Sequence, residues 1–138
     1  MKRFFILFFL SAFIFGANAQ TFKMNNKRDL KTAKGVAVTF FRDINRGKYE
    51  DSLTLFKNDP VAANELSLEE YKRFVDENIT NGRKIKKIFL TEKDVEDNEN
   101  QLEYTITIFY KDKSEKEKWV IVEKVEGVWK LTTRGSLF

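Results

Sequence analysis

The sequence predicts an α+β fold in which helices come first and an antiparallel sheet follows. Between residues 30 and 79, apolar residues recur at spacings of three and four, the period of an amphipathic helix. From residue 85 onward they alternate at every second position, the period of a strand. Helical segments followed by a run of strands are typical of the α+β class.

The N-terminus is typical of a secretory signal peptide. Lys2 and Arg3 precede an apolar run over residues 4–15, and small residues lead to a cleavage site between Ala19 and Gln20. The run is too short to cross a bilayer, which takes about 20 residues. The chain has no Cys to carry a lipid anchor. We therefore expect an exported protein, periplasmic or secreted, that is soluble after cleavage and has neither a membrane span nor a lipid anchor.

Three segments are expected: a signal peptide over residues 1–19, a flexible polar lead-in over residues 20–29, and a single α+β domain over residues 30–138. Without the signal peptide, 23 basic residues face 21 acidic ones, and the two signs are interleaved. This nearly neutral surface argues against a nucleic-acid partner.

The composition excludes several chemistries. With no Cys in the chain, no disulfide holds the fold together. With no His, the commonest general base and every Ser-His or Cys-His nucleophile pair are missing. Zinc sites of the usual kind are excluded as well. We expect no metal, no cofactor and no catalytic residue set.

Three helices are predicted. The first covers residues 30–44, and the second, shorter one covers residues 49–56. Ser67 and Glu70 form a capping box that opens the third helix, because the Ser hydroxyl and the Glu carboxylate can each accept a bond from an amide at the other's position. Asn81-Gly82 closes that helix.

Four strands are predicted after the helices. The clearest covers residues 102–110, where apolar and polar residues alternate strictly. An acidic loop over residues 94–100 precedes it, and a charged hairpin connection over residues 111–118 follows it. The other three strands are expected at residues 85–90, 119–122 and 129–132. The irregular alternation in the first of them is typical of a bulge.

In three short stretches the sequence resembles the nuclear-transport-factor-2-like superfamily, whose cystatin-like fold is a curved antiparallel sheet wrapped around helices. The similar stretches are residues 37–41, 45–49 and 125–131. Within the superfamily the chain is most similar to small exported bacterial domains of unknown function, often lipoproteins. The resemblance covers residues 30–134. It implies a cone between sheet and helices in which enzymatic relatives place His, Asp or Tyr, and an outer sheet face through which relatives commonly dimerise.

Four aromatic residues form a candidate pocket in this cone. Tyr104 and Tyr110 share a strand face with apolar residues and are expected to point toward the helices. Their hydroxyls either line a small pocket or belong to core tyrosines that are satisfied at its rim. Tyr71 and Trp129 are the other two candidates, and both are explained equally well as core residues.

The register of the last two strands decides which residues face outward. If Glu126-Gly127 is a two-residue turn, Val122 pairs with Leu131 and Val120 with Thr133. A bulged or odd-length turn would exchange the two faces of the third predicted strand.

The stretch 119–122 is apolar at every position, which is typical of a strand that is covered on both sides. The two-residue turn places Trp119 and Ile121 on the outer face. Phe109 lies off the core face of its own strand. Phe109, Trp119 and Ile121 are therefore a candidate dimer patch.

These observations predict a non-enzymatic exported domain that binds a small apolar ligand or a protein partner, as a homodimer. One alternative is a His-free isomerase or dehydratase that uses Tyr and a carboxylate in the cone. Another is a structural accessory to an envelope assembly.

Overall fold

The computed structural model describes residues 19–93 and 99–138 of the chain. The expected signal sequence up to residue 18 and residues 94–98 of the expected acidic loop lie outside the described residues. In the described part no helix is long and apolar enough to span a bilayer.

A five-stranded antiparallel sheet with strand order β1-β2-β3-β4-β5 forms one layer. The strands are β1 (Ala19–Lys23), β2 (Ile85–Lys93), β3 (Gln101–Tyr110), β4 (Glu115–Val125) and β5 (Val128–Gly135). Three helices form the second layer: α2 (Ala33–Asn45), α3 (Tyr49–Leu53) and α4 (Leu68–Val75). The predicted α+β class is confirmed.

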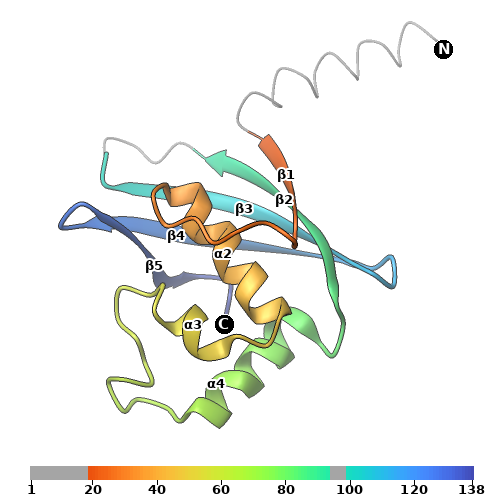
Figure 1. Cartoon of the computed structure of the whole chain (residues 1–138), viewed down its shortest axis with the longest axis horizontal. Coiled ribbons are helices and arrows are strands. Elements are labelled where there is room, and N and C mark those ends of the chain that lie inside the picture. The colour runs from red at the N-terminus through yellow and green to blue at the C-terminus, as the bar shows by residue number, and fades with distance from the viewer. Residues whose placement is uncertain (1–18, 94–98) are drawn as a thin grey trace, which may run out of the picture.

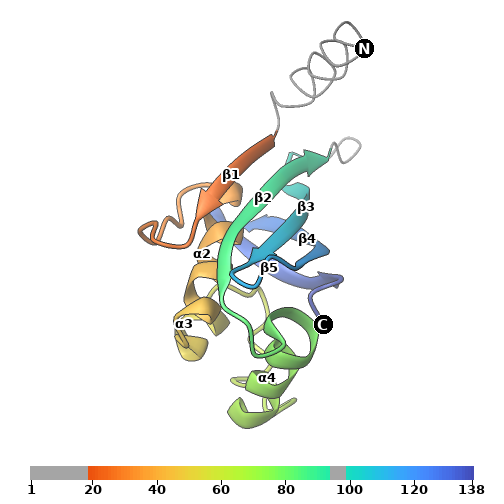
Figure 2. The ribbon, with the colours of Figure 1, turned by 90° about the vertical axis from the view of Figure 1, so that its right-hand side faces the viewer.

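The helices cover one face of the curved sheet (Figure 1 and Figure 2). Helix α2 begins at Thr32, whose hydroxyl accepts a bond from the Gly35 amide. Helix α4 begins at the predicted capping box, in which Ser67 and Glu70 bond reciprocally. One turn of π-helix (Asp76–Thr80) extends α4 and ends at Asn81, which adopts the left-handed conformation. The three predicted helices and the end of the third are therefore confirmed.

The segment 20–29 differs from the expected flexible lead-in, because residues 19–23 form edge strand β1 on β2. Phe22 pairs with Ile88 and Gln20 with Leu90. Backbone bonding to a distant strand drives this pairing, and the polar composition of the segment does not reveal it. The sheet has five strands where the sequence predicts four.

A buried ionic clamp holds the chain between β1 and α2. The Asp43 carboxylate on α2 is fully buried and contacts Arg28 at 2.8 Å and Arg42 at 2.9 Å. Burial raises the pKa of Asp43, and the two guanidinium groups oppose that change. Arg42 also donates to the Asn26 carbonyl at 2.6 Å. The clamp thus joins the segment after β1 to the helix layer.

Strand β4 is longer than predicted. It begins at Glu115, and the hairpin connection shrinks to a short turn that includes Lys113, which has a φ of 73°. The extra strand residues 115–118 are charged and alternate between exposed and half-buried positions. Because no apolar alternation marks this stretch, sequence periodicity assigns it to a loop.

The β4–β5 hairpin is a two-residue turn with positive φ at Glu126 (51°) and Gly127 (80°). Val122 pairs with Leu131, as predicted. The predicted partner of Val120, Thr133, is wrong: Val120 pairs with Gly135, because β5 carries a bulge that adds two residues. The bulge lies beyond Val122, so the faces set by the turn are kept.

The turn gives a stability prediction. Glu126 is not a residue that favours left-handed φ, whereas Asn is. Glu126→Asn should raise the free energy of unfolding by about 0.5–1 kcal/mol, and Gly127→Ala should lower it by about 1 kcal/mol. Urea denaturation measures both, and equal effects of the two changes would contradict a turn with two left-handed residues.

The clamp gives a second prediction. Asp43→Ala leaves two guanidinium groups without their carboxylate and should cost about 3 kcal/mol of unfolding free energy. Glu65→Ala, at an exposed carboxylate away from the clamp, is the matched control and should change it little. A loss for Asp43→Ala no larger than for the control, measured by urea denaturation, would mean that the clamp does not contribute.

Candidate functional site

The interior of the cone is built around the three predicted tyrosines. Tyr71, Tyr104 and Tyr110 are each 1% exposed. The Tyr71 hydroxyl lies 2.7 Å from the Ser52 hydroxyl, and Tyr104 donates to Glu92 at 3.2 Å. Tyr110 donates to the backbone carbonyl of Ile79. Every phenol has a partner within the protein, as expected for core tyrosines.

The candidate pocket residues do not share a cavity. Tyr71 packs beside Phe138 with ring centroids 6.0 Å apart, and Trp129 is half-buried with the Lys124 ammonium 5.7 Å from its ring. Apolar side chains fill the space between them, including Phe40, which is fully buried. None of the four candidate residues lines any of the main surface cavities in the described part of the chain.

The pKa values of two cone tyrosines are raised by their surroundings. Burial raises the pKa of Tyr71, and burial together with the neighbouring Glu92 raises that of Tyr104. Both phenols are therefore protonated at neutral pH. The Tyr104–Glu92 pair is the Tyr–carboxylate arrangement that a His-free isomerase would need, but Tyr104 does not line any of the main cavities formed by the described residues. No group of metal-ligating side chains occurs in the described residues.

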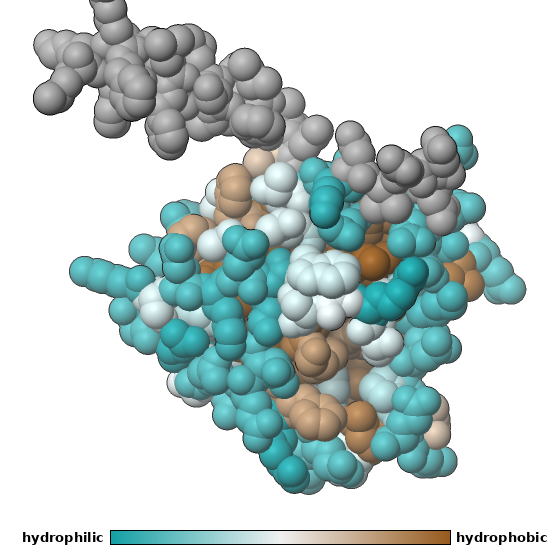
Figure 3. Space-filling model, turned by 180° about the vertical axis from the view of Figure 1, so that it is seen from behind, coloured by the Kyte–Doolittle hydropathy of each residue, from teal (hydrophilic) through white to brown (hydrophobic). Residues whose placement is uncertain are grey.

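The outer face of the sheet has a different character. Trp119 is 40% exposed and pairs with Thr105 on β3, and Phe89 of β2 is 37% exposed and pairs with Thr107. Phe109 is half-buried on the same face, with the Lys87 ammonium 5.3 Å from its ring. Seen from behind the helices, pale and brown residues gather in the middle of this view, with teal residues around them (Figure 3).

The predicted patch is therefore only partly exposed. Trp119 faces outward, as the register predicts. Ile121 is on the same face but only 7% exposed, and it lies outside the core cluster. Ile121 lies inside the sheet with a strand on either side: Glu103 of β3 is its cross-strand partner, and Thr132 of β5 donates to its carbonyl at 3.0 Å. Phe89 is the outer-face aromatic that sequence reasoning missed; its position between two buried residues, Ile88 and Leu90, is the signal that would have found it.

Charges on this face are arranged in rows. Glu115 and Glu117 lie on β4, while Lys87 on β2 and Lys23 on β1 lie on the opposite side of β3. Among the described residues none of these four has an ion-pair partner, in contrast to Lys93, which contacts Glu103 at 3.3 Å. The outer face thus combines exposed aromatic rings with an acidic row and a basic row.

Comparison with known proteins supports the fold. A crystal structure from Campylobacter jejuni, described provisionally as an NTF2-like transpeptidase, superposes with a TM-score of 0.53 at 14% sequence identity. The match covers 73% of this chain and 97% of that one. This chain has the nuclear-transport-factor-2-like fold. No family model and no curated protein matches its sequence.

The bonded tyrosines give a third prediction. Tyr110→Phe leaves the buried Ile79 carbonyl without its donor and should cost about 1–3 kcal/mol of unfolding free energy. Tyr49→Phe is the matched control, because Tyr49 is half-buried and its hydroxyl makes no hydrogen bond to the described residues. Equal effects of both changes in urea denaturation would contradict a structural role for the Tyr110 hydroxyl.

Proposed function

We propose that this protein is an exported, non-enzymatic interaction domain that pairs with a second copy of itself through the outer face of its sheet. The observation that carries the proposal is the exposed Trp119, which follows the acidic residues along β4 and lies on the opposite side of β3 from the basic row. Large exposed aromatics with a polar surround are characteristic of interface centres.

The charge rows favour a self-complementary contact. A two-fold axis parallel to β3, between two facing sheets, brings β2 of one copy opposite β4 of the other. Lys87 and Glu115 lie at the same level of the sheet, since both flank Phe109. In such a pair, Lys87 of each copy faces Glu115 of the other. Trp119 of each copy faces β2 of the other near Thr91. A dimer of this kind therefore contains two contacts between Lys87 and Glu115, one on each side of the axis.

Export is supported by the charged and apolar pattern of residues 1–19, and the absence of Cys and His supports a non-enzymatic role. The described activity of the Campylobacter protein is not transferred to this chain. Acyl transfer needs an activated nucleophile, and neither a Cys-His nor a Ser-His pair is possible here. The filled cone likewise gives no support to a small apolar ligand or to an isomerase or dehydratase.

The proposal predicts a concentration-dependent dimer. Trp119→Glu places charges at the centre of the contact and should weaken dimerisation by at least about tenfold. Leu30→Glu is the matched control, because Leu30 is 46% exposed next to α2 and lies outside the sheet. Light scattering and sedimentation velocity measure the dissociation. A strict monomer at high concentration, unaffected by Trp119→Glu, would refute the dimer.

A charge exchange tests the geometry of the pair. Lys87→Glu and Glu115→Lys should each weaken the dimer, and the double variant should recover most of the loss because the opposite charges are restored. Additive losses in the double variant would contradict the axis parallel to β3 while leaving dimerisation itself intact.

A further inference from the structure

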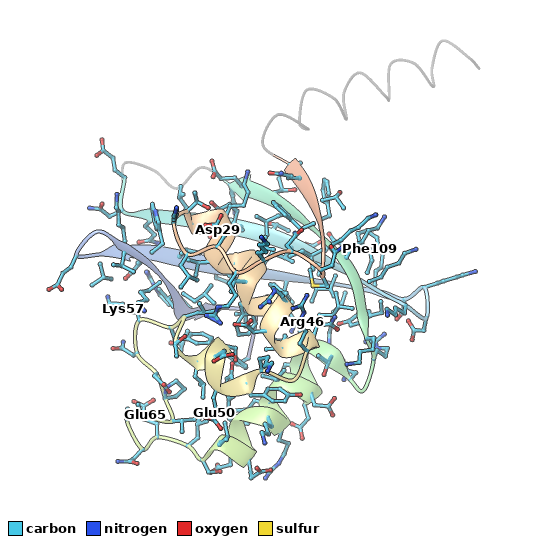
Figure 4. The ribbon with its side chains drawn as sticks, in the orientation of Figure 1. Asp29, Arg46, Glu50, Lys57, Glu65 and Phe109 are labelled. Atoms are coloured by element: carbon cyan, nitrogen blue, oxygen red, sulfur yellow. The ribbon has the colours of Figure 1, made fainter. Side chains whose placement is uncertain are left out.

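The chain between β1 and α2 arches over a surface cavity that the outer-face contact does not use. The cavity has a volume of about 560 Å³, within the range of small-molecule sites. Asp29, on its rim, lies over α2 in Figure 4. The lining residues are Gln20, Thr21, Phe22, Lys23, Asn25, Asn26, Lys27, Asp29, Gly35 and Val38.

The walls of this cavity are fixed by bonds to the helix. Besides the Asp43 clamp, Arg46 donates to the Met24 carbonyl at 3.3 Å. The Thr39 hydroxyl accepts from the Asp29 amide at 3.0 Å and donates to the Asp29 carbonyl at 3.3 Å. A loop held at both ends loses little conformational entropy when a ligand enters, so the site is preorganised.

The floor is formed where the segment touches the helix. A Cβ atom added at Gly35 would lie 2.6 Å from the Asp29 carbonyl, so a larger residue there would push the segment off α2. Phe22 and Val38 provide the apolar part of the surface. The cavity thus has an apolar part and a polar rim.

The polar rim keeps unused hydrogen-bonding capacity. Among the described residues, no partner bonds the side chains of Asn25, Asn26, Lys23 or Lys27. Each amide offers two donors and one acceptor, which matches vicinal hydroxyls that both donate and accept. The ammonium groups of Lys23 and Lys27 outnumber the single carboxylate of Asp29, so the rim carries a net positive charge that favours a negatively charged ligand.

We propose that this cavity is a saccharide-binding site for a short, hydroxyl-rich sugar that carries a carboxylate. The sugar hydroxyls bond Asn25 and Asn26, the C–H face of a ring lies against Phe22, and the carboxylate lies near Lys23 and Lys27. An apolar ligand would leave the amides and ammonium groups desolvated without partners.

Titration of the isotope-labelled protein, followed by amide NMR shifts, tests the site. The probes are digalacturonate, neutral cellobiose and the acidic dipeptide glycylglutamate at millimolar concentration. Digalacturonate should shift the amides of residues 21–29 and Gly35 saturably, and more tightly than cellobiose. The double variant Asn25→Ala/Asn26→Ala should weaken its binding at least about tenfold. Asn58→Ala, at an exposed amide on another surface, should bind like the wild type.

Three results would overturn the proposal. They are the absence of saturable shifts in this segment with either sugar, unchanged affinity in the double variant, and dipeptide binding at the same amides as tight as that of digalacturonate. An unchanged melting temperature in both variants shows that any loss of binding is local. Lys23 is the one charged residue that the cavity shares with the outer-face rows, and neither variant changes it. None of these results therefore bears on dimerisation.

Discussion

Phe40 packs edge to face against Phe41 and Phe56, with ring centroids 5.2 and 5.6 Å apart, and this aromatic cluster fills the space between α2 and the sheet. A chain with no disulfide must obtain its stability from such packing. The same packing fills the interior of the cone with apolar side chains. The two surfaces proposed for binding therefore lie outside the cone, on the far face of the sheet and at the cavity beside β1.

Both surfaces depend on polar interactions that the apolar core does not provide. The Asp43 carboxylate and its two arginines fix the segment that shapes the cavity. The Glu126-Gly127 turn fixes which side of β4 faces outward, because a shift of one residue would bury Trp119 and expose the core side chains. The core gives the protein its stability, while the clamp and the turn determine the shape of the two surfaces proposed for binding.

Local patterns in the sequence predict what local interactions determine. The capping box at Ser67, the alternation that marks β3 and the outward direction of Trp119 follow from spacing and turn chemistry. Strand β1, the bulge in β5 and the burial of Ile121 do not, because each depends on contacts with residues far away in the chain. The cavity beside β1 could not be predicted for the same reason. Its polar lining has the composition of an unstructured segment, and only the distant contacts of the Asp43 clamp hold it in place.

The two edges of the sheet are not alike. Along β5, the Lys57 amide donates to the Leu131 carbonyl at 2.7 Å and the Leu131 amide donates to the Leu55 carbonyl at 2.8 Å, so this edge is already occupied by the chain itself. The edge at β1 has no further strand among the described residues. A sheet that can be extended on one side only can join one neighbour edge to edge and then stops, whereas a sheet open on both sides can grow into a fibre. The short backbone bridge at Leu131 therefore leaves β1 as the edge at which a second sheet could be added.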